Sequence, residues 1–147
     1  WDGPNATGTI ALFDTTVALS VARESGRIDL NAAEPALLYA YFRSQGLSDA
    51  DARSWRDRIA DWVDVGDEAR ESGAEQFDYR RAGLSVAPDN APFNAVTDLR
   101  RLLGGDRLNP QVLDGLTVYT RSAGVSWADA HPAVRRAPNT SPTGGTA

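Results

Sequence analysis

The sequence predicts an α+β fold that is mainly helical and carries a few short β-strands. Segments 31–46 and 48–63 place apolar residues at the spacing of amphipathic helices. Segment 16–23 instead alternates larger apolar residues with small ones, the period of two that is typical of a strand. The chain has 147 residues, of which 41% are hydrophobic and 24% charged, as expected for a single globular domain with at most a small annex.

The N-terminal region, residues 1–24, is expected to contain short β-strands, arranged either as a β-hairpin or as two strands of a sheet. Residues 1–8 contain glycine, proline and asparagine and are interpreted as a loose lead-in. Strands are predicted over Thr9–Phe13 and Thr16–Arg23. The intervening Asp14 favours a turn between them.

Residues 25–115 are expected to form the helical part of the chain. Asn31 is predicted to cap the first helix, which has Pro35 in its first turn. Ser48 is predicted to cap the second, with Asp51 three residues on as an aspartate variant of the capping box. The charged residues of the second helix are expected mostly on its other faces. Its inward face is predicted to carry the apolar side chains Trp55, Ile59, Trp62 and Val63.

Shorter elements are predicted beyond the second helix. Asn94 is expected to cap a helix through Leu103, and a short helix is expected over 111–116. Residues 116–137 should hold a strand over 116–120 and a short helix. The polar segment 138–147 is expected to be disordered.

The composition excludes several kinds of site. Without cysteine the chain has no disulfide, no thiolate metal site and no cysteine nucleophile. The single histidine, His131, cannot form a multi-histidine metal site, and its place before Pro132 predicts a helix start, not a base.

The apolar runs are too short to span a bilayer. The 20 acidic and 15 basic residues give a net charge of −5, which disfavours nucleic acid as a partner.

The segment 64–90, called here the acidic loop, has no sustained period and is unusually long for an irregular stretch. Its first 15 residues contain six carboxylates: Asp64, Asp67, Glu68, Glu71, Glu75 and Asp78. Crowded carboxylates repel one another, and a hard cation such as calcium takes oxygen ligands in irregular geometry. A cation site is therefore one interpretation. The other is a solvated loop whose acids pair with Arg70, Arg80 or Arg81.

Five segments of the chain form an ordered pattern that covers most of residues 20–136. They are Glu24–Ala33 (ESGRIDLNAA), Asp61–Asp64 (DWVD) with Asp67, Glu68 and Gly73–Glu75 (GAE), Asn90–Phe93 (NAPF) with Asp98 and Leu99, Leu116–Tyr119 (LTVY), and Gly124 and Val125 with Ala130 and Pro132. Together they resemble the K-type minor pseudopilins of bacterial type II secretion, also called general secretion pathway protein K.

This resemblance implies a non-enzymatic assembly subunit that helps to export proteins across the outer membrane. Family members have an N-terminal membrane helix, a pilin-like α/β part, and a helical insert related to SAM-like and helix-hairpin-helix folds. They sit with the I- and J-type minor pseudopilins at the tip of the periplasmic pseudopilus. The implied partners are those two proteins, the pseudopilus shaft and secreted substrates. The chain is thus expected to be the periplasmic domain of an inner-membrane-anchored protein, without its membrane helix. Residues 1–24 would be the remnant of its pilin-like part.

The resemblance also implies calcium in the helical insert. Carried over position by position, it assigns five ligands to this chain: Asp64, Asp67, Glu68, Glu75 and Asp78. Gly66 stands where the family often has an acidic residue, so a ligand is expected to be missing and the affinity reduced.

The sequence leaves two other functions open. Residues 28–38 and 125–134 also resemble the helix-hairpin-helix nucleic-acid-binding module, whose backbone N–H groups reach a phosphate. Here the connection contains one glycine, Gly46, and the helix after it is acidic. A metal-dependent hydrolase would use the acidic loop. The sequence supplies neither a nucleophile nor a defined open coordination position for that chemistry.

Overall fold

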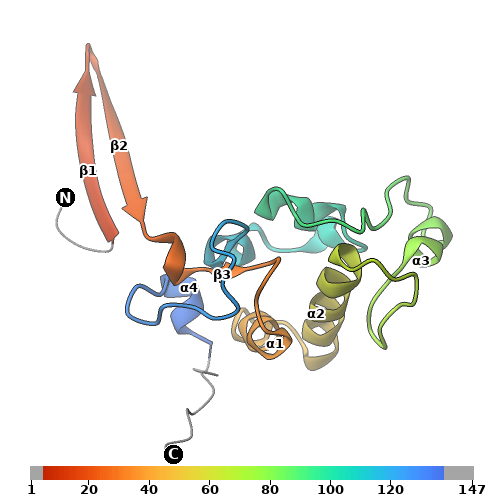
Figure 1. The fold of residues 1–147 in the computed structure, drawn as a ribbon. Helices are drawn as coiled ribbons and strands as arrows, with labels where there is room; N and C mark the ends of the chain where they lie inside the picture. The colour runs from red at the N-terminus through yellow and green to blue at the C-terminus, as the bar shows by residue number, and fades with distance from the viewer. Residues whose placement is uncertain (1–4, 138–147) are drawn as a thin grey trace, which may run out of the picture.

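The computed structural model describes residues 5–137, in which a β-hairpin projects from a body of short helices (Figure 1). In chain order the elements are β1 (Asn5–Leu12), β2 (Thr15–Ala22), η1 (Glu24–Gly26), β3 (Ile28–Asp29), α1 (Pro35–Ser44), α2 (Asp49–Val63), α3 (Gln76–Arg81), η2 (Val96–Arg101), η3 (Gly105–Arg107), η4 (Pro110–Gly115), β4 (Leu116–Thr117) and α4 (Pro132–Arg135), where η marks a 3-10 helix. The predicted α+β, mainly helical fold class is confirmed.

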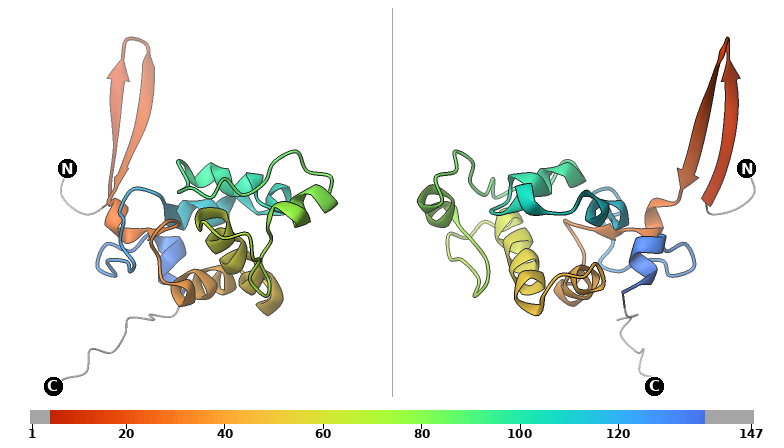
Figure 2. Two further views of the ribbon diagram at one scale, coloured as in Figure 1. Left: turned by 45° about the vertical axis from the view of Figure 1, so that its right-hand side comes forward. Right: turned by 180° about the vertical axis from the view of Figure 1, so that it is seen from behind.

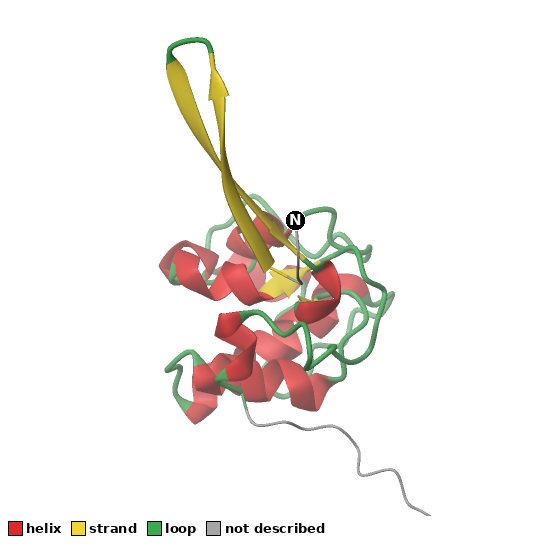
Figure 3. Ribbon diagram, turned by 90° about the vertical axis from the view of Figure 1, so that its left-hand side faces the viewer, coloured by secondary structure: helices red, strands yellow, loops and turns green. Residues whose placement is uncertain are grey.

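The predicted hairpin is confirmed, but its first strand begins earlier than expected. β1 and β2 pair antiparallel, with Ile10 opposite Val17 and Gly8 opposite Leu19. Residues 5–8 are part of this ladder, so the prediction that they form a loose lead-in was wrong. Their small uncharged side chains let the pairing continue to the base of the hairpin. One face of the hairpin carries the larger apolar side chains Ile10, Val17, Leu19 and Val21. Figure 3 shows the hairpin rising from one end of the helical body.

The helical body is built on α1 and α2, which pack against each other and cross at a steep angle (Figure 1). Ser48 caps α2 as predicted, since its Oγ accepts the N–H of Asp51 at 3.1 Å. The predicted cap of α1 was wrong: the helix begins at Pro35, and Asn31 lies outside it. Instead the Asn31 amide forms both backbone hydrogen bonds of Phe93, donating to its carbonyl at 3.0 Å and accepting its N–H at 2.8 Å. A partner 62 residues away thus takes the place of the local cap.

The core contains the apolar face predicted for α2. Trp55, Ile59 and Trp62 are all buried. Trp62 stacks on Phe93 with ring centroids 5.9 Å apart. The ring centroid of Tyr79, in α3, lies 6.1 Å from that of Trp62. The segment with η2, η3 and η4 covers α1 and α2 from one side (Figure 2). The indole of Trp62 therefore joins α2, α3 and the segment before η2 into one hydrophobic cluster.

A short parallel pair of strands, β3 and β4, joins the segment before α1 to the segment after η4. Ile28 pairs with Leu116 and Asp29 with Thr117. The strand predicted over 116–120 ends at Thr117, because the buried carboxylate of Asp29 turns the chain away. That carboxylate accepts the N–H of Arg121 at 2.8 Å.

Three further predictions concern helix starts. The helix predicted over 94–103 is the shorter 3-10 helix η2, and Asn94 does not cap it. Asp98 Oδ2 accepts the N–H groups of Asn94 and Ala95 at 3.1 and 3.0 Å. The predicted short helix after Asn109 is present as η4, with Asn109 Oδ1 accepting the N–H of Gln111 at 3.0 Å. His131 stands at the start of α4 as predicted, because its Nδ1 accepts the N–H of Ala133 at 3.3 Å.

The prediction of disorder for segment 138–147 lies outside the described residues. Within residues 5–137, none of the helices combines the length and the apolar character needed to cross a bilayer.

Candidate functional site

The acidic loop is anchored by the carboxylate of Asp61, which lies in the last turn of α2. Asp61 is completely buried, with 0% of its surface exposed. Its Oδ2 accepts the N–H of Ala74 at 2.9 Å and the N–H of Arg70 at 3.2 Å. A buried charge needs such partners, because it has lost its contact with water. The loop therefore folds back over the end of α2 and wraps this carboxylate.

Asp57, one turn earlier on α2, anchors the same loop. It is only 4% exposed, and its Oδ2 accepts the N–H of Ser72 at 3.2 Å. Its Oδ1 accepts a hydrogen bond from Arg56 Nε at 2.7 Å. The expectation that Asp57 lies on a solvent-facing side of α2 was wrong. Carboxylates at i and i+4 share one helix face, and here that face binds backbone N–H groups of the loop.

Gly73 allows this close approach. A Cβ atom at residue 73 would overlap Oδ2 of Asp61. The backbone of the loop therefore lies against the carboxylate only because residue 73 has no side chain. This geometry gives a physical reason for the glycine between Ser72 and Ala74.

Arg70 supplies a positive charge to the loop. Its Nη1 lies 2.5 Å from Asp61 Oδ1 and 2.5 Å from Asp64 Oδ2. These hydrogen bonds, to Asp61 first and Asp64 second, raise the pKa of the guanidinium. The interpretation that acids of the loop pair with an arginine is thus confirmed for Arg70. Arg80 donates instead to Gln76 Oε1 at 3.0 Å.

Glu75 is a buried carboxylate with one oxygen that lacks a hydrogen-bond partner within the described part of the chain. It is 6% exposed, and its Oε1 has no hydrogen-bond partner among residues 5–137. Burial raises the pKa of Glu75, and the neighbouring carboxylates of Asp61, Asp64 and Asp67 raise it further. A buried oxygen beside other carboxylates is the kind of group that a cation would satisfy.

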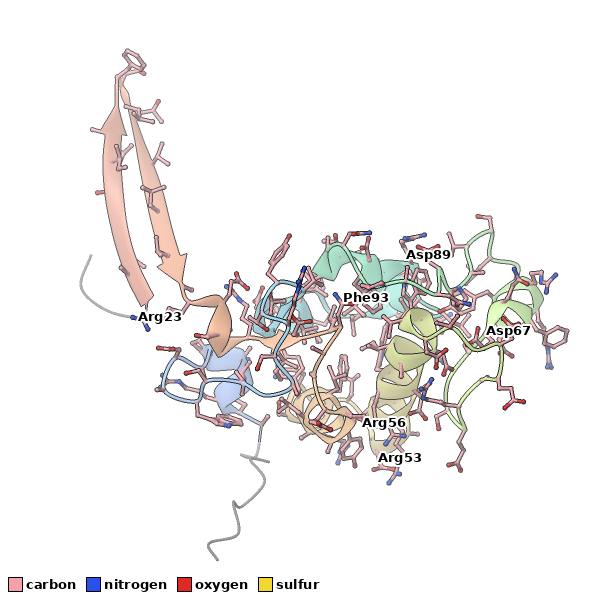
Figure 4. The ribbon with its side chains drawn as sticks, in the orientation of Figure 1. Arg23, Arg53, Arg56, Asp67, Asp89 and Phe93 are labelled. Atoms are coloured by element: carbon pink, nitrogen blue, oxygen red, sulfur yellow. The ribbon has the colours of Figure 1, made fainter. Side chains whose placement is uncertain are left out.

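The five predicted calcium ligands have different surroundings in the structure. Asp64 accepts hydrogen bonds from Arg70 and from the N–H of Gly66, the latter at 3.0 Å. Asp78 Oδ2 accepts the N–H of Glu75 at 3.0 Å and thereby caps α3. Asp67 and Glu68 are exposed, and Figure 4 places Asp67 on the outer part of the loop between α2 and α3.

These ligands are not gathered around one point. Among residues 5–137 there is no group of three or more His, Cys, Asp or Glu side chains that could hold a metal ion. The charge effects on Glu75 nevertheless bring it, Asp64 and Asp67 into one electrostatic neighbourhood, which also contains the unpredicted Asp61. Calcium binding stays a prediction.

A second surface feature is a groove of about 740 Å³ beside α2. Trp55 and Leu108 contribute apolar surface to it, and Arg58 and Asp106 contribute charges. Among the residues that the structure describes, the groove is lined by no serine, threonine or histidine. It therefore supplies no nucleophile–base pair of the kind that acyl transfer uses.

Comparison with known proteins identifies the family and the fold. Residues 18–119 match the family described as type II secretion system (T2SS), protein K. The fold is similar to that of a chain in the crystal structure of the GspK-GspI-GspJ complex from the type 2 secretion system of enterotoxigenic Escherichia coli. The TM-score is 0.58 at 14% sequence identity. The match covers 74% of this chain and 41% of the other chain. This chain therefore spans about two fifths of the length of the chain that it matches. No curated protein matches the chain.

Proposed function

The chain belongs to the type II secretion system protein K family, and from this membership we propose that it acts as a minor pseudopilin at the tip of the pseudopilus. In this role it is a structural subunit that helps to move proteins across the outer membrane, and it has no catalytic function. The observation that carries the proposal is the family match over most of the helical body. The structural roles of the residues that carry the family resemblance support this proposal.

The residues that carry the family resemblance hold the fold together. Asp29 and Asn31 bind backbone groups of distant segments, and Asp61 with Gly73 seats the acidic loop. The contacts of Asn31 and Asp29 join residues 62 and 92 positions apart in the sequence, and those of Asp61 fold the acidic loop back onto α2. A body stiffened in this way suits a subunit that transmits contacts within an assembly.

The projecting hairpin supports a connection to the pilin-like part of the family. β1 and β2 contain no charged residue, and their long edges carry none of the charges or prolines that usually protect an exposed edge. Isolated two-stranded hairpins are marginally stable in water. We therefore assign residues 5–22 to the pilin-like part, in which their apolar face is covered.

The proposed partners are the I- and J-type minor pseudopilins. A protein of similar fold was solved as part of the GspK-GspI-GspJ complex. By analogy, this chain would act on the periplasmic side of the inner membrane, held there by an N-terminal helix of the full-length protein. Contacts with the pseudopilus shaft and with secreted substrates are part of the same proposal.

Complex formation tests this function. The periplasmic part of the full-length protein should co-purify with the I- and J-type proteins of the same bacterium and sediment as one ternary species. A bacterium lacking the protein should lose type II secretion, and plasmid-borne full-length protein should restore it. Three separate species in the sedimentation experiment, together with normal secretion in the deletion strain, would contradict the proposal.

Nucleic-acid binding by a helix-hairpin-helix module is not favoured by the geometry. The turn between α1 and α2 contains Gly46 at φ +89°. The first turn of α2, where a phosphate would bind, carries Asp49 and Asp51. Acidic residues stabilise a helix N-terminus themselves and repel a phosphate from it.

Calcium is proposed as a structural ion of the acidic loop, and Glu75 is the observation that fits it. Its unpartnered buried Oε1 lies in the same electrostatic neighbourhood as Asp64 and Asp67. These three residues, with Glu68 and Asp78 as further oxygen donors, would hold the ion. When bound, the ion would neutralise the carboxylates and fix the loop on α2.

Glu75→Gln should separate the two effects of this carboxylate. In chelator at neutral pH the variant should melt at or above the wild-type temperature, because a neutral amide replaces a charge that burial disfavours. The pKa of Glu75 is raised above its ordinary value of 4.5, so ionised Glu75 destabilises the folded state as the pH rises through the folded pKa. The advantage of glutamine should therefore vanish below that ordinary value. Thermal melts over a pH series measure it.

The same variant should lose most of the stabilisation that calcium gives the wild type. Glu71→Gln is the matched control, because Glu71 is exposed and belongs to the same loop. An equal rise in melting temperature with calcium in wild type and Glu75→Gln would show that Glu75 is not a ligand.

A further inference from the structure

The hairpin is attached to the helical body through a very short connection. β2 ends at Ala22 and η1 begins at Glu24, so Arg23 alone separates them. Among the described residues, no hydrogen bond or ion pair joins positions 6–22 to the helical body. Figure 1 and Figure 3 show the hairpin pointing away from that body. The direction of the hairpin therefore depends on how Arg23 and η1 are held.

Asp129, in the loop before α4, holds this connection from the side of the body. Its Oδ2 accepts the hydroxyl of Ser25 at 3.1 Å, and its Oδ1 lies 3.8 Å from Nη1 of Arg23. The hydroxyl of Ser126 donates to the same Oδ2 at 3.1 Å and keeps the carboxylate in its own loop. We propose that Asp129 is the positioning residue of a rigid joint, which sets the direction in which the hairpin leaves the helical body.

Backbone contacts close the same joint. The carbonyl of Ser25 accepts the N–H of Ser126 at 2.8 Å, and the carbonyl of Gly26 accepts the N–H of His131 at 2.9 Å. Gly26 is buried, and a Cβ atom at this residue would overlap the carbonyl oxygen of Asp129. The glycine thus lets η1 lie directly against the loop. η1 is therefore fixed to the helical body, and the freedom left to the hairpin lies in the one residue before η1.

The joint brings together two of the five sequence segments that carry the family resemblance. The first segment contains Ser25 and Gly26, and the last contains Ala130 and Pro132, which flank His131. The hydrogen bond between the serine hydroxyl and the loop carboxylate spans 104 positions of the sequence. Neither segment contributes to the acidic loop. Their contact at the foot of the hairpin gives both of them a structural role.

The two side-chain contacts of Asp129 differ in strength. Its side chain is 17% exposed, whereas that of Arg23 is 63% exposed. A hydrogen bond to a charged acceptor is stronger than one between neutral groups, but an ion pair with an exposed arginine contributes little. Ser25 should therefore contribute more to the positioning than Arg23. If residues 5–22 belong to the pilin-like part, the joint fixes the angle between that part and the helical body; this meaning rests on the proposed function, whereas the rigidity does not.

Distances between spin labels measure the direction of the hairpin, and a chain without cysteine can be labelled specifically. Labels at Thr9→Cys and Ala50→Cys would occupy exposed positions of β1 and α2. Double electron–electron resonance on the 147-residue chain should give one narrow distance distribution. In Asp129→Ala the distribution should broaden to at least about twice that width, because a short connection freed of its contacts acts as a hinge.

A second variant tests the joint from the side of the hairpin. Arg23→Gln combined with Ser25→Ala removes both side chains that the connection offers to Asp129. Both residues are exposed, so the helical body should keep its fold. This double variant should also broaden the distribution. Glu24→Ala is the matched control, because Glu24 is an exposed residue of η1 whose ion pair with Arg27 does not reach the loop before α4. It should keep the wild-type width.

Two results would overturn the proposal. A broad distribution in the wild type would show that the hairpin is free at its base. Distributions as narrow in both variants as in the wild type would show that the backbone contacts alone set the direction. If Asp129→Ala loses its helical circular dichroism, the double variant decides by itself. None of these results affects the co-purification test with the I- and J-type proteins, so failure of the joint is distinguishable from failure of the assembly role.

Discussion

Replacing Asp61 by alanine should lower the free energy of unfolding by about 3 kcal/mol, because one buried and one part-buried N–H group lose their acceptor at about 1–3 kcal/mol each. The groups are the backbone N–H of Ala74 and of Arg70, both of which donate to Asp61 Oδ2. For a chain of this length the melting temperature should fall by about 10 °C. Urea unfolding in chelator, followed by tryptophan fluorescence, measures the change, since Trp62 follows Asp61 directly in α2.

Asp64→Ala is the matched control for this prediction. Asp64 also binds Arg70, but its side chain is 35% exposed, and water can replace the lost contacts. Its loss should lower stability by about 1 kcal/mol or less. Equal losses in Asp61→Ala and Asp64→Ala would mean that the loop is held by its net charge and not by the buried anchor.

Local rules were sufficient for the part of the fold that depends on nearby residues. The start of α2 follows from the hydroxyl of Ser48, which reaches an N–H three residues on. The burial of Trp55 and Trp62 follows from their spacing on one helix face. The hairpin follows from the alternation in residues 16–23. In each case the partner lies within a few turns or within the adjacent strand, so the sequence pattern contains it.

Local rules failed where the partner is distant. Asn31 has the chemistry of a helix cap, but its amide binds Phe93, 62 residues away. Asp57 and Asp61 have the pattern of solvent-facing charges, because amphipathic periodicity assigns any charged residue to the outside. Their burial depends on unpaired N–H groups of an irregular loop. The one available signal was their i, i+4 spacing ahead of a long glycine-containing segment.

The candidate site was predictable as a region but not as a set of contacts. Charge density identified the acidic loop, and the family resemblance selected Asp64, Asp67, Glu68, Glu75 and Asp78 within it. Which carboxylate meets Arg70 depends on how the loop folds over α2, and that path follows from Gly73 and the buried Asp61. An irregular backbone has no period from which such a path can be deduced, so Asp61 was not predicted as part of the site.

Asp29→Ala should lower the free energy of unfolding by about 3 kcal/mol, because here too several donors lose a buried carboxylate that accepts their hydrogen bonds. Asp29 is 0% exposed. Its Oδ1 accepts the N–H of Asn31, and its Oδ2 accepts the N–H of Arg121, both at 2.8 Å. The hydroxyl of Thr120 donates to Oδ2 at 3.1 Å. Alanine would leave these part-buried donors without their acceptor inside the protein. Chemical denaturation gives the change in stability.

The position of Asp29 also determines where the loss of structure should appear first. β3 and β4 pair through two residues each, Ile28 with Leu116 and Asp29 with Thr117, so the parallel pair has little stability of its own. Hydrogen exchange in Asp29→Ala should accelerate at the amide of Arg121 more than at amides inside α2. Glu24→Ala is the control, because Glu24 is exposed and its ion pair with Arg27 at 2.8 Å should contribute about 1 kcal/mol or less. Unchanged exchange at Arg121 in Asp29→Ala would show that this turn is held by other contacts, and that the carboxylate does not join the two ends of the body.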